Sequence, residues 1–126
     1  MRITVFSLIA VGLTVLAIAA CGTEESRPQR LYDFYQHERE SNPTRLAARI
    51  AAEEMRKFSG HITNIDGPKV QFHPDDRISQ RDRYIECRFA DLESVSQLDT
   101  GQYITLFGRL VRADHIIVFD DCTVAQ

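Results

Sequence analysis

The sequence predicts a small, mainly β domain preceded by two short helices. Between residues 31 and 54 the apolar residues recur at helical spacing, whereas from residue 56 onward they alternate with polar residues in short segments that end at turns. The chain has 126 residues, 44% of them hydrophobic and 26% charged, with a formal net charge of −3. This length and composition allow one domain and exclude wholesale disorder, a collagen-like repeat and a multi-domain enzyme.

The first predicted helix covers residues 31–40. Leu31, Phe34 and Tyr35 share one of its faces, and charged residues occupy much of the rest. An aromatic stripe at helical spacing indicates packing against a core more often than it indicates a ligand platform. We therefore expect this face to pack on the rest of the domain.

The second predicted helix begins at Pro43 and runs to about residue 54. Asn42 is a good helix cap and proline suits the first helical position, so Ser41, Asn42 and Pro43 end one helix and begin the next. Leu46 and Ile50 lie four residues apart on one side of this helix. That side should dock on the domain.

Five strands and one further short helix are predicted after residue 56. Asp66, Gly67 and Pro68 form a turn between the first two strands, and apolar residues at 92, 95 and 98 have a spacing that suits one or two helical turns. The predicted strands are residues 57–65, 69–73, 83–90, 102–112 and 116–123, with the helix between the third and the fourth.

Three strands, a helix and two more strands is the order of an OB fold, a five-stranded and partly open β-barrel. Gly60 and Gly108 support this fold, because each lies inside a long predicted strand, where glycine lets the strand bend enough to close a small barrel. The predicted fold is therefore a five-stranded OB-fold barrel preceded by two short N-terminal helices.

The first 20 residues are typical of a secretory signal peptide. Arg2 is their only charged residue, and an apolar run extends from residue 3 to residue 20. The run ends in Ile18-Ala19-Ala20-Cys21, which resembles the lipobox of bacterial lipoproteins. A plain transmembrane anchor is the alternative, but polar residues dilute the run and the chain turns polar directly after Cys21.

The lipobox resemblance implies that Cys21 receives diacylglycerol and becomes the first residue after cleavage. Gly22 follows it where an Asp would retain a Gram-negative lipoprotein in the inner membrane, which implies delivery to the outer membrane, facing the periplasm. The membrane is then a partner through the lipid. Three regions result: a signal peptide at 1–20, the lipidated cysteine and a polar tether at 21–30, and the folded domain at 31–126.

With Cys21 lipidated, Cys87 and Cys122 remain as an even pair in an oxidising compartment, which predicts a disulfide. They lie on the third and fifth predicted strands, which are neighbours in an OB barrel. Two buried free thiols are the alternative. No metal site is expected, because neither cysteine has another two to four residues away.

Several segments carry a resemblance to a known family, namely residues 58–65, 84–89, 98–108 and 119–122. In these segments the chain resembles the tRNA_anti-like family, bacterial lipoproteins whose OB domain is similar to a tRNA anticodon-binding domain. The two-cysteine pattern is the most specific part of the resemblance. It implies the OB fold and a lipid-anchored protein, and it brings no established activity.

OB barrels bind ligands on the second and third strands and the adjoining loops, which predicts a candidate ligand face here. Single-stranded nucleic acid would need this face to be basic. Loss of Arg2 with the signal peptide leaves 14 basic residues against 18 acidic ones, so nucleic acid is not an expected partner. A solvated strand face is the alternative reading of the same residues. The candidate residues are Phe72, Arg77, Arg81, Arg83 and Arg88.

The four histidines are scattered, and no catalytic or phosphate-binding motif is present, so no enzyme activity, cofactor or metal is expected. We expect a lipid-anchored envelope protein whose periplasmic OB domain is a binding or interaction module. Its partner would be an envelope protein, a glycan or a small anion. The alternatives are a single-stranded nucleic-acid-binding domain, and an inhibitor or exclusion factor acting on an envelope enzyme or on DNA-transfer machinery.

Overall fold

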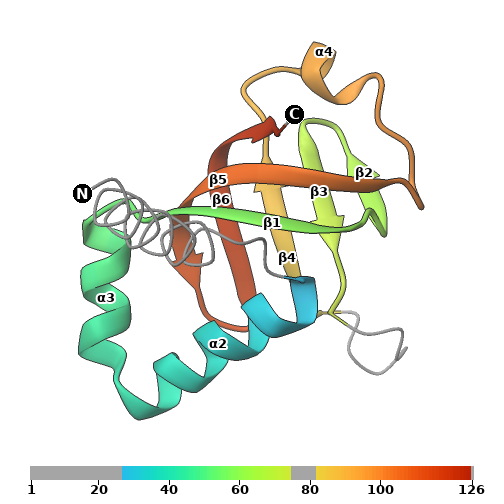
Figure 1. Cartoon of the computed structure of the whole chain (residues 1–126). Coiled ribbons are helices and arrows are strands. Elements are labelled where there is room, and N and C mark those ends of the chain that lie inside the picture. Colours follow the sequence, from blue (N-terminus) through green and yellow to red (C-terminus); the bar gives the residue numbers. More distant parts are fainter. Residues whose placement is uncertain (1–26, 75–81, 126) are drawn as a thin grey trace, which may run out of the picture.

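The computed structural model describes residues 27–74 and 82–125. Figure 1 shows the leading helices beside the sheet and a short helix at the end of the sheet far from them. A mainly β domain behind two leading helices is therefore confirmed. The elements are α2 (Pro28–Ser41), α3 (Pro43–Ala51), β1 (Met55–His61), β2 (Asn64–Asp66), β3 (Lys69–Phe72), β4 (Tyr84–Arg88), α4 (Leu92–Val95), β5 (Tyr103–Ala113) and β6 (Ile116–Val124).

The described strands form one six-stranded sheet in the order β1-β5-β6-β4-β3-β2. β4 and β6 are parallel, and the other neighbouring strands are antiparallel. β1 and β2 follow one another in the chain but lie at opposite ends of this order. No ladder joins them, so the sheet is not closed by hydrogen bonds between β1 and β2.

The predicted strand at 57–65 is therefore two strands, and the expectation of one continuous strand is wrong. The chain changes its partner at residues 62 and 63. The Ile62 N–H donates to the carbonyl of Gln102, the residue before β5, over 2.9 Å, and the Thr63 N–H donates to the carbonyl of Gln71 in β3, also over 2.9 Å. A chain that changes from one neighbour to another within two residues cannot keep a single continuous ladder.

The break between the two helices follows the prediction. Pro43 is the first residue of α3, and the side chain of Asn42 accepts a hydrogen bond from the Arg45 N–H over 3.2 Å. The predicted helix extends to about residue 54, which is too far. α3 ends at Ala51, and Glu53 adopts a left-handed backbone conformation with φ of 55°, which a helix cannot continue through.

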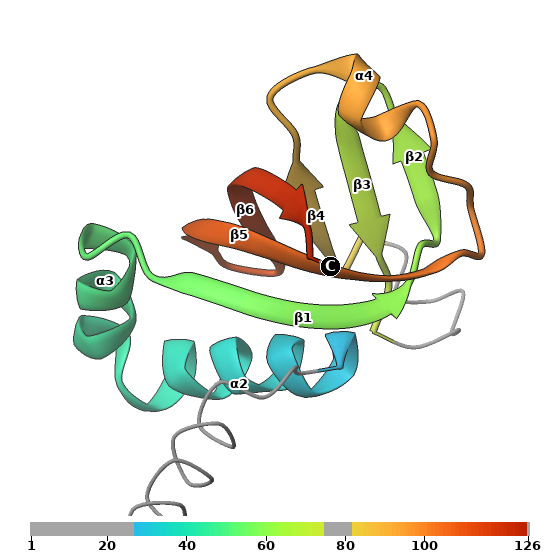
Figure 2. The ribbon, with the colours of Figure 1, turned by 45° about the horizontal axis from the view of Figure 1, so that its top comes forward.

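Helix α2 lies along β1 beneath the curved sheet, as Figure 2 shows. The ring of Tyr35 lies 6.3 Å from that of Phe119, which lies 5.5 Å from Phe58. Phe58 in turn meets Phe72 edge-on at 5.2 Å. All four side chains are completely buried. The predicted helix face therefore packs on the core, with Phe34 left partly exposed.

Gly60 and Gly108 both lie where another atom needs the space that a Cβ would fill. A Cβ on Gly60 would lie 2.4 Å from Cγ of Pro28, so glycine lets the first turn of α2 rest on β1. A Cβ on Gly108 would lie 2.7 Å from Cβ of Phe119 and 2.9 Å from Sγ of Cys122. Glycine at these positions thus permits close packing within the domain.

No helix among residues 27–74 and 82–125 is long and apolar enough to cross a membrane. The predicted signal peptide, the lipobox and Cys21 lie outside the described residues.

Candidate ligand-binding cleft

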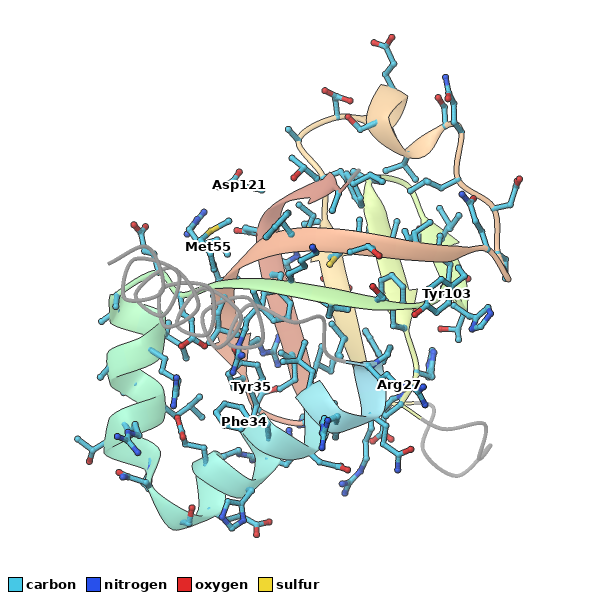
Figure 3. All side chains as sticks on the ribbon, viewed as in Figure 1. Arg27, Phe34, Tyr35, Met55, Tyr103 and Asp121 are labelled. Atoms are coloured by element: carbon cyan, nitrogen blue, oxygen red, sulfur yellow. The ribbon has the colours of Figure 1, made fainter. Side chains whose placement is uncertain are left out.

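A cleft of about 480 Å³ opens where the start of α2 meets the ends of β1 and β3. Figure 3 shows Arg27 and Tyr103 on the same side of the molecule, at this end of β1. Four segments that are far apart in sequence therefore contribute to one surface. The lining residues are Arg27, Pro28, Gln29, Ser59, Gly60, His61, Thr63, His73, Pro74 and Tyr103.

His61 and Tyr103 form one wall of the cleft. They are directly opposite one another in the β1–β5 ladder, and their rings meet edge-on with centroids 4.9 Å apart. Tyr103 is 57% exposed. The His61 contact orients the tyrosine ring, and much of the ring surface stays open to solvent.

His73 lies beyond the end of β3 and is positioned by Thr63. Its backbone N–H donates to Oγ1 of Thr63 over 3.1 Å, and its ring Nδ1 lies 2.5 Å from the same oxygen. The Thr63 hydroxyl also contacts the carbonyl of Gln71 at 3.0 Å. Thr63, which lies in the link between β1 and β2, therefore positions the imidazole of His73.

The cleft is positively polarised. Arg27 is the charged side chain among the described lining residues, and none of those residues is Asp or Glu. Arg27 also occupies the N-cap position of α2, whose first turn contains no acidic residue. The start of a helix carries a partial positive charge, so a cation there adds to the local field and does not cancel it. The described lining thus favours a negatively charged group.

Of the candidate ligand face predicted from the sequence, the structure describes Phe72, Arg83 and Arg88. Phe72 is completely buried in the core, so its ring is not available for stacking on a ligand. Arg83 is exposed next to β4, while Arg88 pairs with Glu86 at 2.8 Å and with Asp120 at 3.9 Å. Arg77 and Arg81 lie outside the described residues.

Sequence reasoning noted His61 and His73 only as scattered histidines and did not predict the cleft. Its lining comes from residues 27–29, 59–63, 73–74 and 103, which no local motif connects. The one available signal was the pairing of the first and fourth predicted strands, which places His61 beside Tyr103.

The two cysteines lie on neighbouring strands, as predicted, because β4 and β6 pair directly. Both are buried free thiols in the structure, and the Cys122 thiol donates a hydrogen bond to the carbonyl of Phe119 over 3.4 Å. Burial raises the pKa of the Cys87 thiol well above its ordinary value, and the Cys122 thiol raises it further. A disulfide between them stays a prediction.

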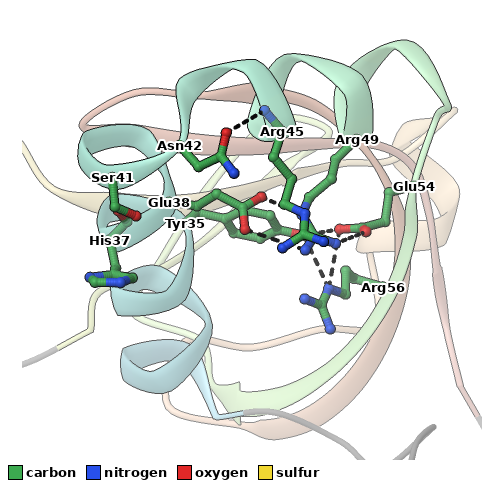
Figure 4. A network of polar contacts seen from close by, with 9 residues as sticks. All are labelled: Tyr35, His37, Glu38, Ser41, Asn42, Arg45, Arg49, Glu54 and Arg56. Carbon is green, nitrogen blue, oxygen red and sulfur yellow. Dashed lines mark hydrogen bonds and ion pairs between the residues drawn. The ribbon is translucent and has the colours of Figure 1, made fainter.

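A second polar cluster, shown in Figure 4, joins α2, α3 and the chain entering β1. Arg49 binds Glu38 and donates to Oε1 of Glu54 over 2.6 Å. Tyr35 Oη donates to Oε2 of Glu54 over 2.7 Å and accepts from Nε of Arg56 over 3.1 Å. These side chains bind one another, so the cluster, which we call the clamp, joins the three elements and offers a ligand few hydrogen-bonding groups.

The pKa values of the clamp follow from these contacts. Burial acts to raise the pKa of Glu54, but hydrogen bonds from Tyr35 and Arg49 and the charges of both arginines outweigh it, so that pKa lies below the ordinary value. Burial and the hydrogen bond to Glu54 raise the pKa of Tyr35 well above its usual range. The clamp therefore exists as an ionised carboxylate with a protonated tyrosine at neutral pH.

Comparison of the chain with protein-family models, with curated proteins and with solved structures found no match. The resemblance to tRNA_anti-like lipoproteins rests on the sequence segments alone. Within the described residues, no group of three or more His, Cys, Asp or Glu side chains is placed to hold a metal ion. The site for which the geometry offers a role is the cleft.

Proposed function

We propose that this protein is a binding module of the bacterial envelope, which takes its ligand in the cleft between α2, β1 and β3. The observation that carries the proposal is the cleft itself, with its exposed Tyr103, its two imidazoles and Arg27. Its volume of about 480 Å³ is within the usual range for small-molecule sites. The proposed role is binding, with no catalytic step.

The proposed domain is an OB-fold barrel like that of the tRNA_anti-like lipoproteins. Such a barrel has one long, bent first strand, and β1 and β2, which pair with β5 and with β3 respectively, would take its place. α4 lies between β4 and β5, and the parallel pairing of β4 with β6 supplies the contact between the third and fifth strands of such a barrel.

The proposed location is the periplasmic face of the outer membrane. A lipid on Cys21, in the Ile18–Cys21 lipobox, would hold the domain there, and Gly22 supports outer-membrane sorting. Labelling with a radioactive fatty acid tests this part. The wild-type chain should incorporate label and Cys21→Ala should not, whereas a labelled variant would contradict the anchor.

Photo-crosslinking in cells that make the full chain tests the binding site. Tyr103 is replaced by the photoreactive residue p-benzoylphenylalanine, which keeps an aromatic ring at the cleft wall. The matched control carries the same residue at Leu92, which is 63% exposed on α4, at the far end of the sheet from α2 (Figures 1 and 2). Mass spectrometry then identifies any adducts.

Adducts at position 103 with none at position 92 support a ligand site in the cleft. No adduct at position 103, or equal adducts at both positions, would contradict it. Oligonucleotide adducts at position 103 would replace the proposal by nucleic-acid binding.

A further inference from the structure

We propose that the ligand of the cleft is a small organic anion, in which one phosphate or carboxylate group stands next to a ring. This inference rests on the proposed function, because it assumes that the cleft is the ligand site. It adds the chemical class of the ligand, which follows from the two unlike halves of the cleft wall.

One half of the wall suits the anionic group. Arg27 presents a guanidinium, whose fork of N–H donors matches the oxygens of a carboxylate or phosphate. His61 and His73 bring two imidazoles to the same cleft, and none of the described lining residues is acidic. An anion bound here would also relieve the unfavourable placement of Arg27 at the positive end of α2.

The other half suits a ring. Tyr103 is 57% exposed, and its contact with His61 is edge-on, so the tyrosine is oriented but not covered by the histidine. Pro28 and Pro74 add apolar surface. A flat or cyclic group can therefore rest against Tyr103 while its anionic substituent reaches Arg27.

Size and charge restrict the ligand further. A cleft of about 480 Å³ is far larger than a bare inorganic anion needs, since one water molecule accounts for about 30 Å³ of liquid. A single arginine matches one anionic group, whereas a nucleic-acid strand requires several phosphate contacts along its backbone. A small anion with one ring meets both restrictions.

Isothermal titration calorimetry on the full chain in a mild detergent tests the inference. Phenyl phosphate is the probe with both features, benzoate is its carboxylate counterpart, inorganic phosphate lacks the ring, and phenol lacks the charge. We expect phenyl phosphate or benzoate to bind at least about tenfold more tightly than either inorganic phosphate or phenol. The tighter of the two identifies the anionic group.

Variants assign the two halves of the site. Arg27→Gln should weaken the tighter probe about tenfold or more. Arg45→Gln, an equal change of charge at an exposed position of α3, should leave its affinity unchanged. Tyr103→Ala should remove the advantage over inorganic phosphate, and Tyr103→Phe should keep it.

Equal weakening by Arg27→Gln and Arg45→Gln would overturn the inference, because it would mean that the anion responds only to overall charge. Absence of binding by both ring-bearing anions would overturn it as well. If photo-crosslinks still form at position 103 in that case, the cleft binds a ligand of another class and the proposed function stands. If they do not form, both proposals fail.

Discussion

Arg49 lies between two carboxylates, the buried one of Glu38 and the half-buried one of Glu54. Its guanidinium also lies over the ring of Phe34, 5.0 Å from the centroid, and that of Arg56 lies 4.9 Å from the same centroid. Two cations therefore contact the ring of Phe34, which also meets the buried ring of Tyr35 edge-on at 5.2 Å. These cation–π contacts explain why Phe34, a residue of the predicted packing face, can remain 36% exposed.

Replacing Arg49 tests the clamp. Arg49→Met would leave the Glu38 carboxylate buried without its cation, so the free energy of unfolding should fall by about 1–3 kcal/mol. Arg45→Met, on an exposed position of the same helix, should change it by no more than about 0.5 kcal/mol. Urea denaturation of the full chain followed by circular dichroism measures both, and equal effects would show that the clamp contributes nothing.

Glu54 makes the clamp sensitive to acid. Its pKa is lower in the folded protein than in the unfolded chain, where a glutamate titrates near about 4.3, so ionised Glu54 stabilises the fold above that pH. The stabilisation is lost as the pH falls through the lower, folded pKa. Urea unfolding between about pH 6 and pH 3 should therefore show a smaller acid loss of stability for Glu54→Gln than for wild type. An identical loss would contradict the account.

The clamp could not be predicted from the sequence. Arg49 is 11 residues from Glu38 and five from Glu54, and neither separation is the three or four that places side chains together on one helix. The burial of Phe72, by contrast, could be predicted from strand periodicity. Val70 and Phe72 alternate along one predicted strand, so they share a face, and both are completely buried.

At the scale of elements, the contact between α2 and β1 shapes the cleft. Pro28, the first residue of α2, packs on Gly60 in β1, and both residues line the cleft. The contact between Pro28 and Gly60 therefore fixes the position of Arg27 relative to His61.

The elements themselves could be predicted from the sequence, since turn residues and periodicity located nearly every one. Their contacts across the sheet could not, because strand periodicity does not say where a chain changes partner.

Gly60→Ala should disrupt this contact. The added Cβ would lie 2.4 Å from Cγ of Pro28, so α2 must shift, and we expect a loss of about 1–3 kcal/mol in the free energy of unfolding. Pro28→Ala removes the opposing Cγ and should restore part of that loss in the double variant. Urea denaturation of the two single variants and the double variant measures the coupling. Simple additivity would show that the two residues do not contact one another.

The second prediction at the scale of elements concerns the cysteines of β4 and β6. These cysteines are buried on neighbouring strands, so oxidation in the proposed periplasmic location should join Cys87 to Cys122. Such a bond would close a loop of 35 residues and stabilise the domain by about 3–4 kcal/mol. Unfolding in an alkylating agent without reductant, followed by mass measurement, should find neither cysteine alkylated in protein taken from the envelope. Two alkylated thiols would contradict the bond.

At the scale of the whole molecule, the proposed anchor and the cleft lie close together along the chain. Arg27 follows Cys21 by six residues, and an extended chain spans at most about 3.6 Å per residue. A lipid on Cys21 would therefore hold the cleft within about 20 Å of the membrane surface. The predicted lipobox rests on a local motif, whereas the cleft could not be predicted from any local motif, because its walls come from four separate segments.

The central claim is that the ligand binds in the cleft and not at Arg83 and Arg88, the described arginines of the ligand face predicted from the sequence. Amide chemical-shift mapping by NMR, on the full chain in detergent micelles titrated with phenyl phosphate, tests it most directly. The account predicts shifts at Gln29, His61, His73 and Tyr103, with Arg88 and Leu92 unchanged. Shifts centred on Arg83 and Arg88, or spread evenly over the domain, would contradict it.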